Sequence, residues 1–388
     1  MKSRPLRAVG IAALVALCPF LNSLEAAELP PVPAAMGIPT AGPAAAPGSP
    51  YAPQALAPGG VVMTLFPPDS PYLKPDRIHE AETYGFYGGA LPGYLVNIHN
   101  PSIEFHAGNG ELNTGTAIIL VAGGGHNKLN IFGEGSAMIP YFGSRGISTI
   151  LLRNRLRSDG YDPKTDGVHD LQQAVKLVRA HAEQWNIDPN KIGVLGFSAG
   201  AELCAAASLY YDEFDAKNDM PENPLAKISS RPDFNGLVYP GPSPFFFAFE
   251  DQPSIPADSP PAFFTGPGWG DWIHALWATE YFTALLNDGV PNVELHIYAR
   301  GVHPGDRGKP GQAPATGGIT LRDGVGFGTW QERYMDWLDD LGFTGKPGEV
   351  TRAALDIAAN LDRESPMDVL QERMAERRAA AAAEQKDK

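Results

Sequence analysis

Short apolar segments alternate with longer amphipathic segments through the middle of this chain. The short segments are rich in Val, Ile, Leu and Phe, which is typical of strands that are buried on both faces of a sheet. We expect such strands at residues 116–122, 147–153, 191–195, 236–239, 262–265 and 293–299.

Helical periodicity marks several of the segments between these strands. Residues 170–185 place one set of apolar side chains at helical spacing, namely Leu171, Ala174, Val175, Val178 and Ala182. Further helices are expected at 201–209, 275–286 and 330–341, the last with Trp330, Tyr334, Trp337 and Leu338 on one face. Strands that alternate with helices in this way predict an α/β fold, with a mostly parallel sheet and helices on both of its faces.

The first residues of the chain have the features of a secretory signal peptide. Residues 1–27 combine basic side chains near the start, an apolar stretch at 8–17 and small residues up to Ala27. The apolar stretch is shorter than the ~20 residues that a membrane span needs, although an uncleaved anchor is an alternative. Lipid attachment at Cys18 is disfavoured because the bulky Leu17 precedes it. We therefore expect a secreted or periplasmic protein with no membrane insertion after cleavage.

Composition divides the rest of the chain into three parts. Residues 28–60 are dominated by Pro, Ala and Gly, which is typical of a poorly packed linker. Residues 61–343 have the composition of a single globular domain. Residues 344–388 are charged and rich in alanine, and we expect a tail that is either a solvated helix or disordered.

The sequence Gly-Phe-Ser-Ala-Gly at residues 196–200 lies between an expected strand and an expected helix. The pattern G-x-S-x-G is common by chance, but at a strand-to-helix turn it predicts a nucleophile elbow. Such a turn holds the serine, here Ser198, in a strained backbone, and the small Gly196 and Gly200 let strand and helix approach closely. The helix dipole then favours a developing oxyanion beside the serine.

A serine nucleophile needs a general base, and His303 is the candidate. It lies in the glycine-containing sequence Arg-Gly-Val-His-Pro-Gly, directly after the last expected strand. No other histidine lies in a loop so late in the chain, and His296 is on the strand itself. The alternative is that His303 is an ordinary surface histidine.

The acid that orients the base is expected after the preceding strand, where Asp271 ends the loop Gly-Pro-Gly-Trp-Gly-Asp. Its carboxylate would accept a hydrogen bond from one imidazole nitrogen and so select the tautomer that can take the serine proton. Alternatively, Asp271 only caps the helix that follows. Glu250, Asp251 and Asp258 are the remaining candidates for the acid.

A glycine triplet at residues 123–125 follows the first expected parallel strand. Glycine-rich turns at this position can present backbone N–H groups to a substrate oxygen. We expect oxyanion donors at Gly124, Gly125 and Ala199, although a glycine triplet can also be an ordinary flexible turn.

Overall composition narrows the choice of partners. The chain has 388 residues, 43% of them hydrophobic, and a formal net charge of -14. This charge argues against nucleic acid or an anionic membrane as a partner. Removal of the signal peptide would leave Cys204 as the only cysteine, so no intrachain disulfide is expected. No CxxC, HExxH or EF-hand pattern is present, so we expect no metal and no cofactor.

Several longer segments carry a family resemblance: GTAIILVAGGGH, HDLQQAVKLVRAHAEQWNIDPNKIGVLGFSAGAEL and GVPNVELHIYARGVHPG, in this order. With them, the chain from about residue 97 to 341 resembles α/β-hydrolase esterases of the acetyl xylan esterase and feruloyl-esterase-like group. These are related to dienelactone hydrolase and prolyl oligopeptidase. The resemblance implies an α/β-hydrolase fold, a triad of Ser198, Asp271 and His303, and an oxyanion region at Gly124, Gly125 and Ala199.

Together these observations predict a serine esterase that removes short acyl groups, such as acetyl, from a polysaccharide such as xylan or from a small ester. A serine peptidase of the same fold and a non-catalytic hydrolase-like binding protein are the alternatives. The sequence leaves the oligomeric state open.

Overall fold

A computed structural model describes residues 28–37, 49–86, 91–220, 222–246, 252–303 and 326–386. The expected signal peptide lies outside the described residues, as do Glu250 and Asp251 and the residues that follow His303 up to 325.

The centre of the described structure is an eight-stranded sheet in the order β1-β4-β6-β5-β7-β8-β9-β10. Its strands are β1 (Val61–Thr64), β4 (Ser102–His106), β5 (Ala117–Val121), β6 (Ser148–Arg153), β7 (Ile192–Phe197), β8 (Asn235–Val238), β9 (Ala262–Trp269) and β10 (Glu294–Arg300). The six strands β6-β5-β7-β8-β9-β10 pair in parallel with their neighbours. At one end of the sheet β4 pairs antiparallel with β6, and β1 pairs antiparallel with β4. A separate two-stranded sheet joins β2 (Thr83–Gly85) to β3 (Tyr94–Val96).

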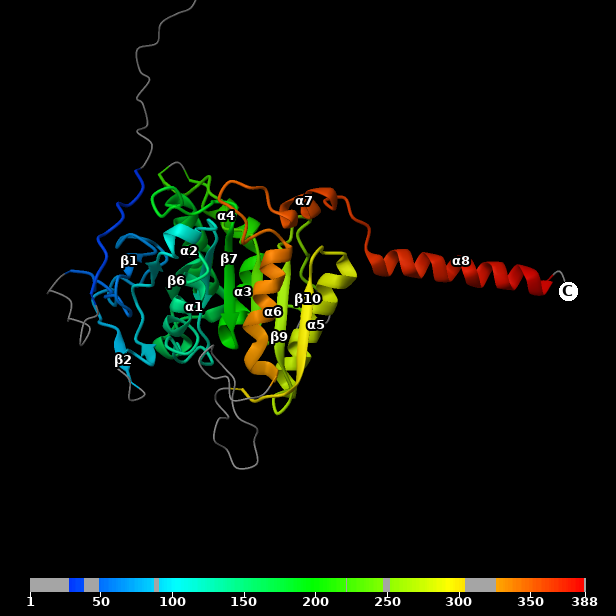
Figure 1. Ribbon diagram of the computed structural model, residues 1–388, viewed down its shortest axis with the longest axis horizontal. Helices are drawn as coiled ribbons and strands as arrows, with labels where there is room; N and C mark the ends of the chain where they lie inside the picture. Colours follow the sequence, from blue (N-terminus) through cyan, green and yellow to red (C-terminus); the bar gives the residue numbers. More distant parts are fainter. Residues whose placement is uncertain are drawn as a thin grey trace, which may run out of the picture.

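Helices cover both faces of the sheet (Figure 1). They are α1 (Ile139–Gly143), α2 (Val168–Ala180), α3 (Ala199–Leu209), α4 (Tyr211–Lys217), α5 (Trp272–Asp288), α6 (Trp330–Asp340), α7 (Arg352–Ala359) and α8 (Pro366–Lys386). Successive residues of a strand face opposite sides, so Ile119 joins one apolar cluster with α2, α3 and α5 while Leu120 joins a second with α1 and α6. The α/β fold expected from the sequence is confirmed.

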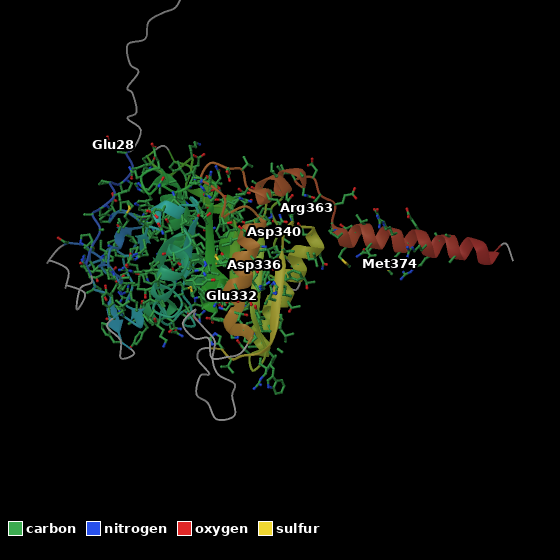
Figure 2. All side chains as sticks on the ribbon, viewed as in Figure 1. Glu28, Glu332, Asp336, Asp340, Arg363 and Met374 are labelled. Carbon is green, nitrogen blue, oxygen red and sulfur yellow. The ribbon has the colours of Figure 1, made fainter. Side chains whose placement is uncertain are left out.

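The helix faces expected from periodicity are buried as predicted. Trp330, Tyr334, Trp337 and Leu338 are at most 4% exposed. The exposed side of the same helix carries Glu332, Asp336 and Asp340, which Figure 2 labels along α6. The apolar face of α6 therefore covers the sheet, and its acidic face meets solvent.

Strand β9 is longer than expected, since it continues from Thr265 to Trp269. Glycine and proline in this segment predict a loop. In the structure Gly266 and Pro267 pair in parallel with Ile297 and Tyr298 of the edge strand β10. This tertiary pairing extends both strands toward the loops that carry Asp271 and His303.

Part of the expected linker packs against the domain. Tyr51 and Leu56 are each 1% exposed. The N–H groups of Leu56 and Ala57 donate to the Glu104 carboxylate at 2.8 and 3.0 Å, and Glu104 is itself paired with Arg153 at 2.5 Å. Because a buried carboxylate needs such donors, this segment completes the antiparallel end of the sheet.

The packing also continues past the boundary expected at residue 343. The buried Lys191 Nζ donates to the carbonyl oxygens of Gly345 and Lys346 at 3.1 and 2.7 Å. In α7, Ala353 and Ile357 are buried against the domain. The segment before α8 therefore belongs to the folded body.

Helix α8 extends away from the rest of the molecule (Figure 1). Most of its side chains are exposed, including Met374 at 44%. This part of the tail is a solvated helix. No helix in the described part of the chain combines the length and hydrophobicity needed to cross a membrane.

Candidate active site

Ser198 stands in the turn between β7 and α3 with a strained backbone. Its φ of 51° and ψ of -119° lie in a region that non-glycine residues rarely adopt. The turn is held by neighbouring backbone: the Ser198 N–H donates to the Val238 carbonyl at 3.0 Å, and its carbonyl accepts from the Gly241 N–H at 3.1 Å. The side chain is therefore presented at the carboxyl edge of the sheet, where ligands bind in open α/β folds.

Close approach of strand and helix explains the two glycines of the motif. A Cβ atom on Gly196 would lie 2.6 Å from the Ala201 Cα, and one on Gly200 would lie 2.0 Å from the Val121 carbonyl oxygen. Both distances are shorter than real Cβ contacts. The elbow geometry therefore requires glycine at both positions.

His303 follows β10 and reaches the serine. Its Nε2 lies 2.9 Å from the Ser198 Oγ, which is hydrogen-bond distance. The residues are 105 positions apart in the sequence, and the parallel order of β7 and β10 brings their loops to the same edge of the sheet. A base at this distance can accept the serine proton.

Asp271 lies at the start of α5, next to the loop that carries His303. Its side chain is buried and makes no capping hydrogen bond to the helix. The alternative that the Asp271 side chain caps α5 is therefore wrong. The two loops are in contact: a Cβ on Gly270 would lie 2.1 Å from the Gly301 carbonyl oxygen. Of the other candidate acids, Asp258 precedes β9 and pairs with Arg231 at 3.2 Å, away from His303.

Two aromatic side chains border the His303 ring. The His274 ring stacks on it with centroids 4.4 Å apart and planes at 14°. The Tyr239 ring meets it edge-on at 5.3 Å. His274 also hydrogen-bonds the Asp271 carboxylate, with 2.5 Å between Nδ1 and Oδ1. Sequence reasoning placed neither residue at the site, although the spacing of Asp271 and His274 on one helix face was a signal for His274.

The glycine triplet packs directly against the elbow. A Cβ on Gly123 would lie 2.5 Å from the Phe197 carbonyl oxygen and 2.9 Å from the Ser198 Cβ. Gly124 and Gly125 have φ values of +136° and +64°, which favour glycine. In the described part of the chain their N–H groups, and that of Ala199, donate to no protein acceptor. These three groups are the ones expected as oxyanion donors.

The Glu134 side chain holds the glycine triplet in place through Gly123, and sequence reasoning also missed this residue. Its carboxylate accepts from the Gly123 N–H at 2.8 Å and from the Tyr239 hydroxyl at 2.9 Å. Burial raises the pKa of Glu134 to about 7, against the lowering effect of the Tyr239 hydrogen bond. One buried carboxyl thus ties the glycine triplet to the tyrosine that contacts His303. No local pattern around Glu134 indicates this, because both partners are brought to it by the fold.

A cavity of about 240 Å³ lies beside the elbow. Its walls come from segments that adjoin Ser198: His126 follows the glycine triplet, Glu202 is on the first turn of α3, and Pro242 follows Gly241. His126 and Glu202 contact each other at 3.1 Å between Nε2 and Oε2. The cavity is therefore a candidate substrate pocket with both polar and apolar walls.

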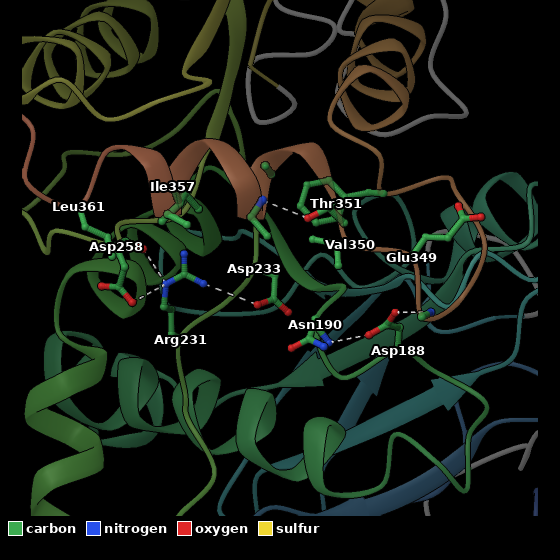
Figure 3. A pocket seen from close by; sticks show the side chains of 15 residues that line it. Asp188, Asn190, Arg231, Asp233, Asp258, Glu349, Val350, Thr351, Ile357 and Leu361 are labelled. Carbon is green, nitrogen blue, oxygen red and sulfur yellow. Dashed lines mark hydrogen bonds and ion pairs between the residues drawn. The ribbon is translucent and has the colours of Figure 1, made fainter.

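A second cavity of about 460 Å³ lies at the amino-terminal ends of the parallel strands, opposite the ends that Ser198 and His303 follow (Figure 3). Its walls include α7 and three acids that precede parallel strands, Asp188, Asp233 and Asp258. Figure 3 shows Arg231 between Asp233 and Asp258. Since Ser198 and His303 follow their strands, this cavity is not part of the same site. Within the described ranges, no three His, Cys, Asp or Glu side chains are grouped so as to hold a metal ion.

Comparisons with known proteins identify relatives of the region that contains this site. Residues 105–238, which include β5, β7 and the elbow, match the BD-FAE family model. The chain is 25% identical over 254 residues to an acetylxylan esterase of Xylanibacter ruminicola, an alignment that covers 59% of this chain and 45% of that protein. The chain therefore spans less than half the length of this relative.

Solved structures resemble the same region. An acetyl ester-xyloside bifunctional hydrolase from Caldicellulosiruptor lactoaceticus is 27% identical with a TM-score of 0.51, covering 63% of this chain and 90% of that chain. A thermophilic esterase of Thermogutta terrifontis has a TM-score of 0.52 at 20% identity, covering 65% and 91% of the two chains, and supports the fold alone. The resemblance inferred from the sequence is confirmed: this chain has the α/β-hydrolase fold, matches the BD-FAE family model over residues 105–238 and is similar in sequence to an acetylxylan esterase.

Proposed function

We propose that this protein is a serine esterase that hydrolyses carboxylic esters, with short acyl groups such as acetyl on a polysaccharide such as xylan as its substrates. The observation that carries the proposal is the 2.9 Å contact between the Ser198 Oγ and the His303 Nε2 at a strained elbow. The relationship to acetylxylan esterases supports the acyl group and the polysaccharide.

In the first half of the reaction, the Ser198 Oγ attacks the ester carbonyl carbon while His303 takes the serine proton. Asp271 orients His303 and stabilises the imidazolium that forms. The tetrahedral oxyanion accepts hydrogen bonds from the N–H groups of Gly124 or Gly125 and of Ala199. His303 then returns its proton to the alcohol, the carbon–oxygen bond breaks, and an acyl-serine remains.

In the second half, water takes the place of the alcohol. His303 removes a proton from the water as its oxygen attacks the acyl carbonyl, and the same donors hold the second oxyanion. Collapse of this intermediate releases the carboxylic acid, and the proton on His303 returns to Ser198. Each proton is therefore handled by one side chain, and no cofactor is needed.

The cavity beside the elbow, of about 240 Å³, has room for an acetyl group. Neither Ser198 nor His303 is among the residues that line it, so its volume does not limit the length of the acyl chain. The signal-like residues 1–27 support a secreted or periplasmic location, where a polysaccharide substrate is accessible.

The test compares hydrolysis of p-nitrophenyl acetate, longer p-nitrophenyl esters and a feruloyl ester by the wild type and by Ser198→Ala. We expect the highest kcat/KM on acetate and a loss of kcat by about 10⁴ to 10⁶ in the variant. Acetate release from acetylated xylan then tests the polysaccharide. Near-wild-type activity of Ser198→Ala would refute the mechanism, and an inert wild type would favour the peptidase or the non-catalytic binding protein.

A further inference from the structure

His274 contacts both the acid and the base of the proposed triad. It lies on the first turn of α5, where its Nδ1 is 2.5 Å from the Asp271 Oδ1. The same ring stacks on His303 with 4.4 Å between centroids and 14° between planes. One imidazole therefore joins the orienting carboxylate to the face of the catalytic ring.

The surroundings of His274 hold it in this position. Its side chain is 15% exposed, and the Trp277 ring meets it edge-on at 5.1 Å and 89°. On His303 the Tyr239 ring provides a further contact, edge-on at 5.3 Å. The His303 ring is thus restrained by His274 against its face and by Tyr239 at another side.

We propose that His274 is a positioning residue for the catalytic pair, a role that rests on the proposed esterase function. Its Nδ1–H donates to the Asp271 Oδ1, and this hydrogen bond restricts rotation of the Asp271 carboxylate, which makes no capping bond to the backbone of α5. Its ring plane keeps His303 in the orientation that points Nε2 at Ser198. His274 touches neither the serine nor, in the proposed mechanism, the substrate.

The physical basis is that a catalytic side chain that moves away from its reactive position lowers the reaction rate. Misplacement of a catalytic group by about 1 Å can lower the rate about 100-fold. Without His274, Asp271 loses a donor and His303 loses a flat contact, so the productive arrangement is populated less of the time. Substrate binding does not involve these groups, and the effect belongs in kcat rather than in KM.

The experiment compares His274→Ala, His274→Asn and His296→Ala with the wild type. Asparagine is the conservative variant because its Nδ2–H can donate from about the position of the imidazole Nδ1–H. His296 is a matched control, since it also bonds a carboxylate at 2.5 Å, that of Glu294, but on β10. The measurements are kcat and KM on p-nitrophenyl acetate and the rate at which a fluorophosphonate labels Ser198. In that labelling the Ser198 oxygen bonds to phosphorus, fluoride leaves, and the serine proton passes to His303.

We expect His274→Ala to lower both kcat and the labelling rate about 10-fold to 100-fold with little change in KM. His274→Asn, which restores the hydrogen bond to Asp271 but not the ring against His303, should be faster than His274→Ala, and His296→Ala should behave as the wild type. A normal kcat in His274→Ala would overturn the proposal, as would a His274→Asn variant that is as slow as His274→Ala. A wild type inert to both reagents would instead overturn the esterase function on which the role rests.

Discussion

Replacement of Gly123 by alanine should damage catalysis without damaging the fold. The new Cβ would lie 2.5 Å from the Phe197 carbonyl oxygen and 2.9 Å from the Ser198 Cβ, whereas ordinary contacts begin at 3.4 Å. The elbow cannot easily yield, because the Ser198 backbone is bonded to Val238 and Gly241 on the neighbouring strand and its loop. The glycine triplet must therefore retreat from the serine by about 1 Å.

This retreat moves the proposed oxyanion donors of Gly124 and Gly125 away from the position of the oxyanion. Loss of one such donor in serine hydrolases costs about 10² to 10³ in kcat, or about 3–4 kcal/mol of transition-state stabilisation. We expect a loss of this size in Gly123→Ala. KM should change little, because the oxyanion forms only in the transition state.

The assay is Michaelis–Menten kinetics on p-nitrophenyl acetate, with thermal unfolding as a check on folding. Gly133 provides the matched control, since a Cβ there would have no neighbour within 4 Å, and Gly133→Ala should keep the wild-type kcat. The φ of Gly123 is not in the positive region, so alanine can adopt its backbone conformation. A folded Gly123→Ala variant with wild-type kcat would refute the assignment of this loop to the oxyanion site.

Two further predictions concern stability. Glu134 has a pKa of about 7 in the folded protein against 4.5 for an unperturbed glutamate, so the unfolded state loses its proton first and stability falls as the pH rises from about 4.5 to 7. Glu134→Gln should abolish this decline, worth up to about 3 kcal/mol, in urea unfolding followed against pH; a difference from wild type that does not vary with pH would contradict it. Ending the chain after Ser365 should leave Tm unchanged, whereas ending it after Phe343 should lower Tm by more than about 5 °C, because Lys191 then loses its carbonyl partners at residues 345 and 346. Equal Tm values for the two truncated proteins would show that residues 344–365, including α7, do not stabilise the fold.

The local pattern of the sequence was enough to predict the fold and the strand-to-helix elbow that carries Ser198. Buried strands appear as continuous apolar runs, and the amphipathic faces of α2 and α6 appear as helical periodicity. The elbow was predictable because its glycines answer a steric demand that arises within a few residues of Ser198. His303 was predictable as a base because it directly follows a strand. Each of these signals is confined to a short stretch of chain.

Only the tertiary structure decided which distant groups meet. Glu134 contacts Tyr239, which is 105 positions later, and neither residue has a local pattern that indicates the other. Residues 51–60 and the segment before α8 look like linker and tail in composition. They are folded because Glu104 and Lys191 are buried polar groups that need their backbone partners.

The same reason accounts for the surroundings of His303, the proposed base. That His274 and Asp271 share a helix face follows from their spacing in the sequence. That His274 also stacks on His303 depends on the pairing of β9 with β10, which brings the two loops together. Local sterics and periodicity are encoded in neighbouring residues, whereas the satisfaction of buried polar groups depends on the whole fold.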